Sequence, residues 1–427
     1  MINSKYINII GLLHNEKRSL DELIHLQYVK LKRIVNHAYN TVQFYKELYD
    51  NCKFRPDEIQ SIEDITKIPV INKQLLAQNS YDTLISNKYS IKKLLPVKTS
   101  GSNGFPYMFY IDHQYDQFRK AQFLRPYITN GKRPFDHSVS FSVTKSTTSK
   151  WFHRFGLLPE SRIFTGEEIN RQIEMLINLK PDIIQGYGSV LNLLSVKIIE
   201  NNISIKKPRL LFTDSELLMP DMRVNIEKAF GTKVIDVYGT FETDNIAYEC
   251  SKHEGYHTAI DSVIMEFLRD NKPVKTGEEG EIVVTILNNF AMPFIRYNLN
   301  DIGSHINKSC SCGRTFPLMN QIKGRASDYM ITDDGRKISV FNLGRFASLA
   351  PNVYEYQIIQ EDFNTFTLLI VPNKSYNNEG ELKIKPAIRK LFPKAEVNIN
   401  LVSSIKREAS GKFKAFKSKV NLSEQNI

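Results

Sequence analysis

The sequence is poor in cysteine and in long apolar runs. Its 427 residues include only four cysteines, too few for a disulfide scaffold in a chain of this length. No apolar run approaches the ~20 residues that a membrane-spanning helix needs. Residues 1–10 are too polar and interrupted for a signal peptide. We therefore expect a cytoplasmic protein without a transmembrane segment.

The chain also lacks internal repeats, low-complexity tracts and motifs for nucleic-acid binding. Its formal net charge of +11 comes from 57 Lys and Arg against 46 Asp and Glu, with the densest basic cluster at residues 406–419. A basic protein can attract an anionic partner. However, no recognition-helix, finger or RNA-binding sheet pattern accompanies the charge. We expect a solvated basic surface and no nucleic-acid partner.

The composition that remains is that of an ordinary globular protein, with 41% hydrophobic and 11% aromatic residues. The chain is too long for one compact core and should hold two or more domains. Over residues 95–240 strand patterns alternate with helix patterns, which predicts a βαβ-type α/β domain. Residues 264–268 and 281–285 then predict a small antiparallel barrel or sheet. From about residue 327 the strands and helices are typical of a small α+β domain.

Residues 97–106 form a loop rich in hydroxyl groups and glycine, with a lysine beside them. Glycine adopts positive φ at little cost, so successive backbone N–H groups can point toward the oxygens of a phosphate. Taken alone, the same composition is typical of a polar hairpin turn. Motifs elsewhere in the chain decide between these two interpretations.

Four further stretches follow the loop, at residues 236–242, 295–301, 324–328 and 410–412. In order and spacing, the five stretches resemble the motifs of the adenylate-forming ligase superfamily. The match is narrower to its phenylacetate-CoA-ligase-like branch, which includes CapK-type proteins of capsular polysaccharide loci. The resemblance reaches from the N-terminal helix to Lys412. It favours the phosphate-binding interpretation of the loop.

The resemblance implies a fold of class α/β with two domains. Residues 1–326 would form a large N-terminal adenylation domain that binds ATP and the carboxylic acid, with the small β-barrel or sheet appended to it. Residues 327–427 would form a small, mobile α+β lid that carries the catalytic lysine.

The resemblance also assigns nucleotide-binding residues. An aromatic face such as that of Tyr238 suits stacking on adenine. The carboxylate of Asp301 suits charge-assisted hydrogen bonds from the ribose hydroxyls. The ATP- and AMP-binding residues implied in this way are Thr99, Ser100, Gly101, Ser102, Asn103, Gly104, Ser215, Glu216, Tyr238, Gly239, Thr240, Asp301 and Arg325.

Two residues would carry the chemistry. Attack of a carboxylate on the α-phosphorus of ATP brings two anions together, and the cation of Lys412 would lower that barrier. Glu242 offers a hard carboxylate oxygen to Mg²⁺. The implied function is an ATP- and Mg²⁺-dependent ligase that converts a small carboxylic acid to an acyl-AMP. It then passes the acyl group to an acceptor, with CoA favoured.

Departures from the family pattern keep alternatives open. Phe241 stands where Thr or Ser usually precedes the metal-binding glutamate, and Ser327 replaces the usual Asp at the hinge. Residues 336–342 replace the stretch that follows in CoA ligases, which weakens the case for CoA. One alternative is a CapK-like protein of capsular or surface polysaccharide biosynthesis with a non-CoA acceptor. The other is a non-catalytic nucleotide-binding assembly protein. A homodimer also stays open.

Three cysteines form a second pattern together with a histidine. Cys310 and Cys312 make a tight pair in a turn, and Cys250 precedes two histidines. Three thiolates and one imidazole would complete a tetrahedral, structural Zn²⁺ site. Similar sets in the family favour His257 as the fourth ligand over His253, which remains an alternative. Without metal, these would be reduced, free cysteines.

Overall fold

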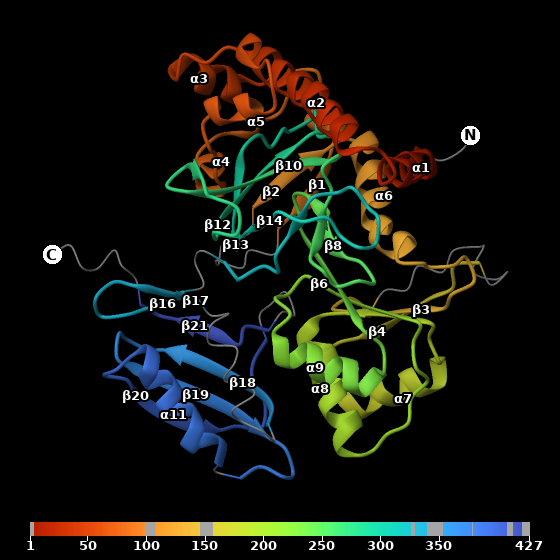
Figure 1. The fold of residues 1–427 in the computed structure, drawn as a ribbon, viewed down its shortest axis with the longest axis vertical. Helices are drawn as coiled ribbons and strands as arrows, with labels where there is room; N and C mark the ends of the chain where they lie inside the picture. The colour runs from red at the N-terminus through yellow and green to blue at the C-terminus, as the bar shows by residue number, and fades with distance from the viewer. Residues whose placement is uncertain are drawn as a thin grey trace. The chain divides into compact units, whose positions relative to one another are not determined.

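The structure is a computed structural model that describes residues 4–99, 107–145, 157–325, 329–339, 353–377, 379–407 and 413–420 (Figure 1). The chain divides into two compact units, and each unit is built from two separate segments. Unit 1 comprises Met1–Gly131 and Val237–Ile322, and unit 2 comprises Lys132–Asp236 and Lys323–Ile427.

Unit 1 begins with three helices: α1 (Ser4–Asn15), α2 (Leu20–Thr41) and α3 (Gln43–Asn51). A capping box starts α2, because Ser19 Oγ accepts from the Glu22 N–H while the Glu22 carboxylate accepts from the Ser19 N–H. The sequence pattern predicts one helix over residues 21–50, and this prediction is wrong at Val42. That residue has extended backbone (φ −121°, ψ 112°), ends α2 and starts α3.

Short helices and a hairpin follow in unit 1. The helices are η1 (Pro56–Glu58), η2 (Glu63–Lys67), α4 (Lys73–Ala77), α5 (Tyr81–Leu84) and η3 (Ile91–Lys93). Strands β1 (Leu95–Lys98) and β2 (Met108–Ile111) then pair antiparallel, with Lys98 opposite Met108. Next comes α6 (His113–Thr129), whose N-terminus is capped by the Asp112 side chain. The sequence predicts this cap, because Asp112 directly precedes a helix pattern over residues 113–128. Figure 1 shows α1 beside α6, where apolar residues of both helices pack together.

The strands of unit 1 form two antiparallel arrays. The first is a four-stranded sheet in the order β11 (Lys272–Pro273), β10 (Val263–Arg269), β12 (Gly280–Ile286), β13 (Tyr297–Gly303). It is a sheet, one of the two forms predicted. The second array continues from β7 (Val234–Thr240) through β8 (Asp244–Glu249), β9 (Tyr256–Thr258), β15 (Leu318–Met319) and β14 (His305–Ile306). One hydrophobic core links residues of α2 and α3 with residues of β10, β12 and β13.

The first half of unit 2 is the predicted α/β region. Its parallel strands lie in the order β6 (Leu210–Asp214), β5 (Ile183–Gly186), β3 (Ser138–Ser142), β4 (Glu160–Phe164). Its helices are α7 (Ile169–Leu179), α8 (Gly188–Glu200) and α9 (Pro220–Phe230), and α8 packs beside α9 (Figure 1). Strands β3, β5 and β6 are largely buried, as is usual for a parallel sheet, whereas β4 at the edge has one buried residue.

The second half of unit 2 is α+β. A ribbon of β16 (Tyr329–Ile331) and β17 (Lys337–Ser339) precedes a four-stranded sheet in the order β20 (Glu396–Leu401), β19 (Thr365–Pro372), β18 (Val353–Gln360), β21 (Phe416–Ser418). Helix α11 (Glu379–Leu391) lies against this sheet (Figure 1). One hydrophobic cluster contains Leu194 and Phe230 of the first half and Ile358 and Phe366 of the second. The boundary at residue 326 and the mobility of the lid remain predictions.

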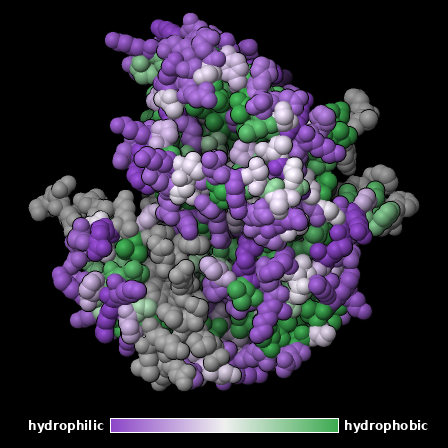
Figure 2. Space-filling model, in the orientation of Figure 1, coloured by the Kyte–Doolittle hydropathy of each residue, from purple (hydrophilic) through white to green (hydrophobic). Residues whose placement is uncertain are grey.

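Hydrophilic residues cover most of the face shown in Figure 2, with hydrophobic residues scattered between them. The large hydrophobic side chains that are exposed include Phe135 and Ile10, at 72% and 68% exposure. Among the helices that the structure describes, none combines the length and the apolar character needed to cross a membrane.

Candidate functional site

Thr99 closes the hairpin of β1 and β2 in unit 1. Its N–H donates to the Tyr107 carbonyl at 2.9 Å, and its Oγ1 accepts from the Tyr107 N–H at 2.9 Å. The predicted loop residues Ser100, Gly101, Ser102, Asn103 and Gly104 lie outside the described residues. The predicted phosphate-binding loop therefore leaves from, and returns to, a paired hairpin end.

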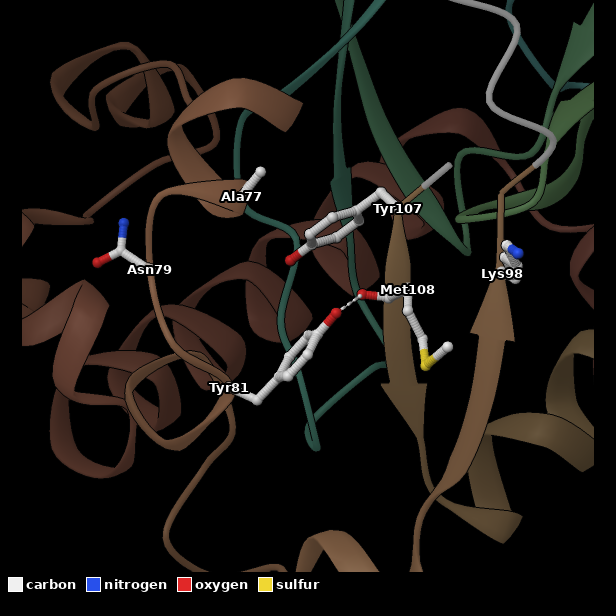
Figure 3. Close-up of a pocket in the computed structure, with 6 residues that line it drawn as sticks. All are labelled: Ala77, Asn79, Tyr81, Lys98, Tyr107 and Met108. Carbon is white, nitrogen blue, oxygen red and sulfur yellow. Dashed lines mark hydrogen bonds between the residues drawn. The ribbon is translucent and has the colours of Figure 1, made fainter. Parts of the chain in front are cut away.

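A cavity of about 290 Å³ borders the same hairpin (Figure 3). Across it, the Tyr81 hydroxyl donates to the Met108 carbonyl at 3.0 Å. The Tyr107 hydroxyl is buried and has no hydrogen-bond partner in the described parts of the chain, and burial raises its pKa. The six lining residues are Ala77, Asn79, Tyr81, Lys98, Tyr107 and Met108. Sequence reasoning missed this cavity, because it forms only where separate elements meet.

Tyr238 and Asp301 contact each other in unit 1. Tyr238 lies near the end of β7 and is half-buried, whereas Asp301 lies on β13 and is 7% exposed. The Tyr238 hydroxyl donates to Asp301 Oδ2 at 2.8 Å. The residues predicted to bind adenine and ribose are thus neighbours, although 63 positions separate them in the sequence.

A tight turn between β7 and β8 places Glu242. A Cβ atom on Gly239 would collide with the Asp244 carbonyl oxygen, so only glycine fits there. Inside the turn, the hydroxyls of Thr240 and Thr243 lie 3.2 Å apart, and Thr240 Oγ1 also accepts from the Thr243 N–H at 3.3 Å. Both hydroxyls therefore help to hold the turn closed.

Glu242 itself is largely buried, at 8% exposure. Its Oε1 accepts from the Tyr297 hydroxyl at 3.3 Å, which orients the carboxylate. The preceding Phe241 is 45% exposed, and its carbonyl accepts from Arg119 Nη2 at 2.7 Å. The arrangement offers one oriented carboxylate, a hard ligand of the kind that Mg²⁺ prefers.

Polar side chains also gather in unit 2, where β5 and β6 end. Gln185 Nε2 donates to Asp214 Oδ2 at 2.7 Å, and Ser215 Oγ donates to Asp214 Oδ1 at 2.8 Å. Ser215 is exposed and has a left-handed backbone (φ +66°). Open α/β sheets bind ligands at the carboxyl ends of their strands. Ser215, one of the residues predicted to bind ATP and AMP, lies at such an edge.

Glu216 follows in the same segment, with its carboxylate already engaged. Its Oε2 accepts from the Ser189 N–H at 3.0 Å, and its Oε1 accepts from the Phe413 N–H at 2.7 Å. Burial raises its pKa, although both hydrogen bonds oppose the change.

Arg325 is half-buried in unit 2, whereas Lys412 and Ser327 lie outside the described residues.

The predicted zinc ligands lie together in unit 1. Cys250 follows β8, His257 lies on β9 between β8 and β15, and Cys310 and Cys312 lie in the turn before β15. The ligand atoms of all four lie within 4.8 Å of one another. His253 is outside this group, and its Nδ1 lies 3.7 Å from Glu249 Oε2. The structure thus brings together the set that includes His257.

The spacing within this cluster suits a tetrahedral metal. Cys250 Sγ lies 3.6 Å from Cys310 Sγ, and Cys312 Sγ lies 3.4 Å from His257 Nε2. Tetrahedral zinc, with bonds of about 2.3 Å to sulfur and 2.0–2.1 Å to nitrogen, would give separations of roughly 3.8 and 3.6 Å. The donor atoms of these two pairs therefore need to move only slightly to bind the ion.

The protonation states of the cluster also fit. Burial, together with the nearby Arg314 charge, lowers the pKa of His257 to about 4, so its imidazole is neutral, as a metal ligand must be. Burial raises the pKa of Cys310 to about 12. Burial also opposes ionisation of Cys312, but the hydrogen bond from the Arg314 N–H and the neighbouring thiols outweigh it and lower its pKa. A bound cation would favour the thiolate form of both Cys310 and Cys312.

The chain is similar in sequence to phenylacetate-coenzyme A ligases and to CapK. The family model described as the CapK C-terminal domain matches residues 330–419. Phenylacetate-coenzyme A ligase of Escherichia coli (strain K12) is 27% identical over 368 residues, covering 80% of this chain and 80% of the relative. Protein CapK of Staphylococcus aureus is 24% identical over 396 residues, covering 88% of this chain and 84% of the relative.

Solved structures agree on the fold. A 2-hydroxyisobutyryl-CoA ligase in the postadenylation state, bound to R3-HIB-AMP, matches with a TM-score of 0.77 at 20% identity, over 94% of this chain and 90% of its own. The same ligase in the thioesterification state, with 2-HIB-AMP and CoA, gives 0.64 at 20% identity, over 95% and 92%. The chain is thus similar over most of its length to phenylacetate-CoA ligases and to CapK, and its fold is that of the 2-hydroxyisobutyryl-CoA ligase.

Proposed function

We propose that the protein is an ATP-dependent, AMP-forming ligase that activates a carboxylic acid and transfers the acyl group to CoA. The observation that carries the proposal is the contact between Tyr238 and Asp301. It places an aromatic ring beside a carboxylate, the pair that would receive adenine and ribose. The curated relatives named phenylacetate-CoA ligase, of which the E. coli protein covers 80% of the chain, support CoA as the acceptor.

The reaction has two steps. In the first, a carboxylate oxygen attacks the α-phosphorus of ATP, a new P–O bond forms, and the bond to pyrophosphate breaks. In the second, the thiol sulfur of CoA attacks the acyl carbonyl carbon. A C–S bond forms, the C–O bond to AMP breaks, and the thiol proton is released to solvent. The products are an acyl thioester, AMP and pyrophosphate.

The residues of the chain would divide this work. The cation of Lys412 offsets the repulsion between carboxylate and phosphate during the first step. Asp301 accepts from the ribose hydroxyls, Tyr238 stacks on adenine, and the loop at Thr99 binds the distal phosphates. Glu242 would hold Mg²⁺, which neutralises phosphate charge when bound. The lid, residues 327–427, would turn about Ser327 between the two steps.

A second candidate function differs only in the acceptor. The CapK C-terminal model matches residues 330–419, and residues 336–342 lack the stretch typical of CoA ligases. These observations favour an acceptor from surface polysaccharide synthesis, carrying a hydroxyl or amine. The two candidate functions are distinguished by supplying either CoA or an amino sugar precursor after the acyl-AMP has formed. The acceptor that becomes acylated identifies the function.

We also propose that Cys250, His257, Cys310 and Cys312 hold a structural Zn²⁺ ion. The geometry of the four side chains supports it. Four protein ligands leave no open position on tetrahedral zinc, so the ion would stabilise the fold and take no part in the ligase chemistry.

Exchange of radioactive pyrophosphate into ATP tests the ligase proposal, with a panel of aromatic and aliphatic acids. We expect exchange with at least one acid, and a loss of roughly 10²–10³ in rate for Lys412→Ala, because a transition-state contact is removed. Lys406→Ala, which changes an exposed lysine of the same basic cluster, is the matched control and should keep full exchange. No exchange with any acid, together with ATP binding that Lys412→Ala leaves unchanged, would contradict the proposal.

A further inference from the structure

Arg314 lies beside the cysteine–histidine cluster and is held from several directions within unit 1. It follows Cys312 by two positions, and its Nη1 lies 3.9 Å from Cys312 Sγ. Its Nε donates to Glu16 Oε2 at 2.9 Å, and its Nη2 donates to the Thr129 carbonyl at 2.5 Å. Only 17% of the Arg314 side chain is exposed. The guanidinium is therefore a fixed positive charge next to the cluster, largely shielded from solvent.

Glu16, the ion-pair partner of Arg314, also contacts a residue that lies beside the cluster. The Tyr248 hydroxyl donates to Glu16 Oε1, and the rings of Tyr248 and His257 have their centroids 6.4 Å apart. Glu16 is 7% exposed, and burial raises its pKa. Both members of the ion pair are thus shielded from solvent, and removing either one leaves the other charge without its ion-pair partner.

The proposed zinc ligands carry an excess of negative charge. A metal binds cysteine as thiolate and histidine as neutral imidazole, so three thiolates would outweigh the two positive charges of Zn²⁺. The site would then carry one net negative charge at a place where Cys250, His257 and Cys310 are buried. A buried charge is costly unless an opposite charge lies close to it. The chain therefore needs a cation beside these ligands.

We propose that Arg314 supplies this positive charge and so determines how tightly the site holds Zn²⁺. Its guanidinium already contacts Cys312 Sγ, at the distance given above. Lys308 is a second cation near the cluster in sequence, but it is exposed, so solvent and salt screen its charge. The proposal rests on the proposed Zn²⁺ site and is independent of the ligase reaction.

A purely structural role for Arg314 predicts a different result. If Arg314 only held the turn before β15 against Glu16 and Thr129, losing Glu16 would weaken zinc binding as much as losing Arg314. If the charge of Arg314 matters, the two losses differ in direction, because Glu16 is itself an anion near the site. Removing its charge should favour the negatively charged zinc site. The direction of the effect of Glu16→Gln is therefore diagnostic.

The test measures the zinc affinity of the purified full-length protein by competition with a chelator of known affinity. Three variants are compared with the wild type: Arg314→Gln, Glu16→Gln and the double variant with both changes. The double variant removes both members of the ion pair, so it still tests the proposal if Arg314→Gln alone does not fold. Lys308→Gln, which removes an exposed cation two residues before Cys310, is the matched control.

We expect zinc affinity to fall about 10- to 100-fold in Arg314→Gln and in the double variant, the usual cost of losing a residue that supports a metal ligand. Glu16→Gln should bind zinc at least as tightly as the wild type, and Lys308→Gln should match the wild type. Unchanged affinity in the double variant would overturn the proposal. So would a loss in Glu16→Gln as large as the loss in Arg314→Gln.

Failure of the zinc site itself gives a distinct result. If the wild type holds no zinc, even after expression with added zinc, the metal proposal fails, and the role of Arg314 fails with it. If the wild type and the double variant hold zinc equally tightly, the zinc site stands and only the role of Arg314 is lost. Neither result depends on whether the protein exchanges pyrophosphate.

Discussion

The hydroxyl of Tyr238 and the carboxylate of Asp301 offer a matched pair of substitutions. Asp301→Asn removes the charge that would accept from ribose, and we expect the KM for ATP to rise about tenfold or more, since hydrogen bonds to charged groups are worth about 1.5–3 kcal/mol. Tyr238→Phe keeps the stacking ring and loses only the hydrogen bond to Asp301. It should raise KM by less. Pyrophosphate exchange measured at varied ATP concentrations gives the KM of each variant. An unchanged KM for ATP in Asp301→Asn would contradict the role assigned to Asp301.

A second residue, Asp221 of α9, should make stability depend on pH. Burial raises its pKa to about 6, and its Oδ1 is buried without a hydrogen-bond partner in the described structure. The folded state therefore holds this proton more tightly than the unfolded state. The stability that this provides is complete below pH ~4 and is lost as pH rises through 6.

Asp221→Asn removes this titration. We expect the variant to be more stable than the wild type by about 1–3 kcal/mol at pH 7, and equal to it near pH 4, because one pKa unit corresponds to about 1.4 kcal/mol. Urea unfolding at both pH values measures the difference. Asp57→Asn, at an exposed position in η1, is the control and should show no such pH dependence. A constant difference at both pH values would contradict the assignment.

At the level of elements, the cysteine–histidine cluster joins the end of β8, the middle of β9 and the turn before β15. We expect about one zinc per chain in purified protein by metal analysis. Cys310→Ser should lose the metal and lower the melting temperature, because the turn before β15 loses its link to β8. Cys52→Ser changes an exposed cysteine outside the cluster and should keep both properties. Zinc near zero, even after expression with added zinc, would end the metal proposal.

Elements with local signals could be predicted from the sequence. The Asp112 cap located the start of α6, and apolar runs between helix patterns located β5 and β6. The break between α2 and α3 could not be predicted, since Val42 fits the apolar spacing of a helix and is buried at 1% exposure. Strands β14 and β15 have two residues each, too few to show alternation.

Much of the candidate site follows from motifs and the rest from tertiary structure. Motif order indicated Tyr238 and Asp301, whose side chains the structure brings into contact. The separate cysteine–histidine pattern indicated Cys250, His257, Cys310 and Cys312, whose ligand atoms lie together. The hydrogen bond from Phe413 to Glu216 joins residues 197 positions apart, and nothing local in either segment encodes it. The cavity beside β1 and β2 depends in the same way on several elements meeting.

At the level of the whole molecule, the chain passes three times between the two units. The chain leaves unit 1 after residue 131, returns to it at residue 237, and enters unit 2 again at residue 323. In unit 2, apolar residues of α8 and α9 share one cluster with residues of β18, β19 and α11. The predicted lid therefore contributes to the hydrophobic core of the unit in which it lies.

This interrupted path has a consequence for synthesis on the ribosome. The buried face of α2, with Leu31 and Ile34, packs in one core with Ile246 and Val284, which are translated more than 200 residues later. Until then that face can pack only against earlier residues of the same core, such as Tyr45 and Phe109, while the whole α/β half of unit 2 emerges. Contacts so distant in sequence slow folding, and exposed apolar faces favour aggregation or chaperone binding in the meantime. The nascent chain, more than the finished protein, is the state most exposed to misfolding.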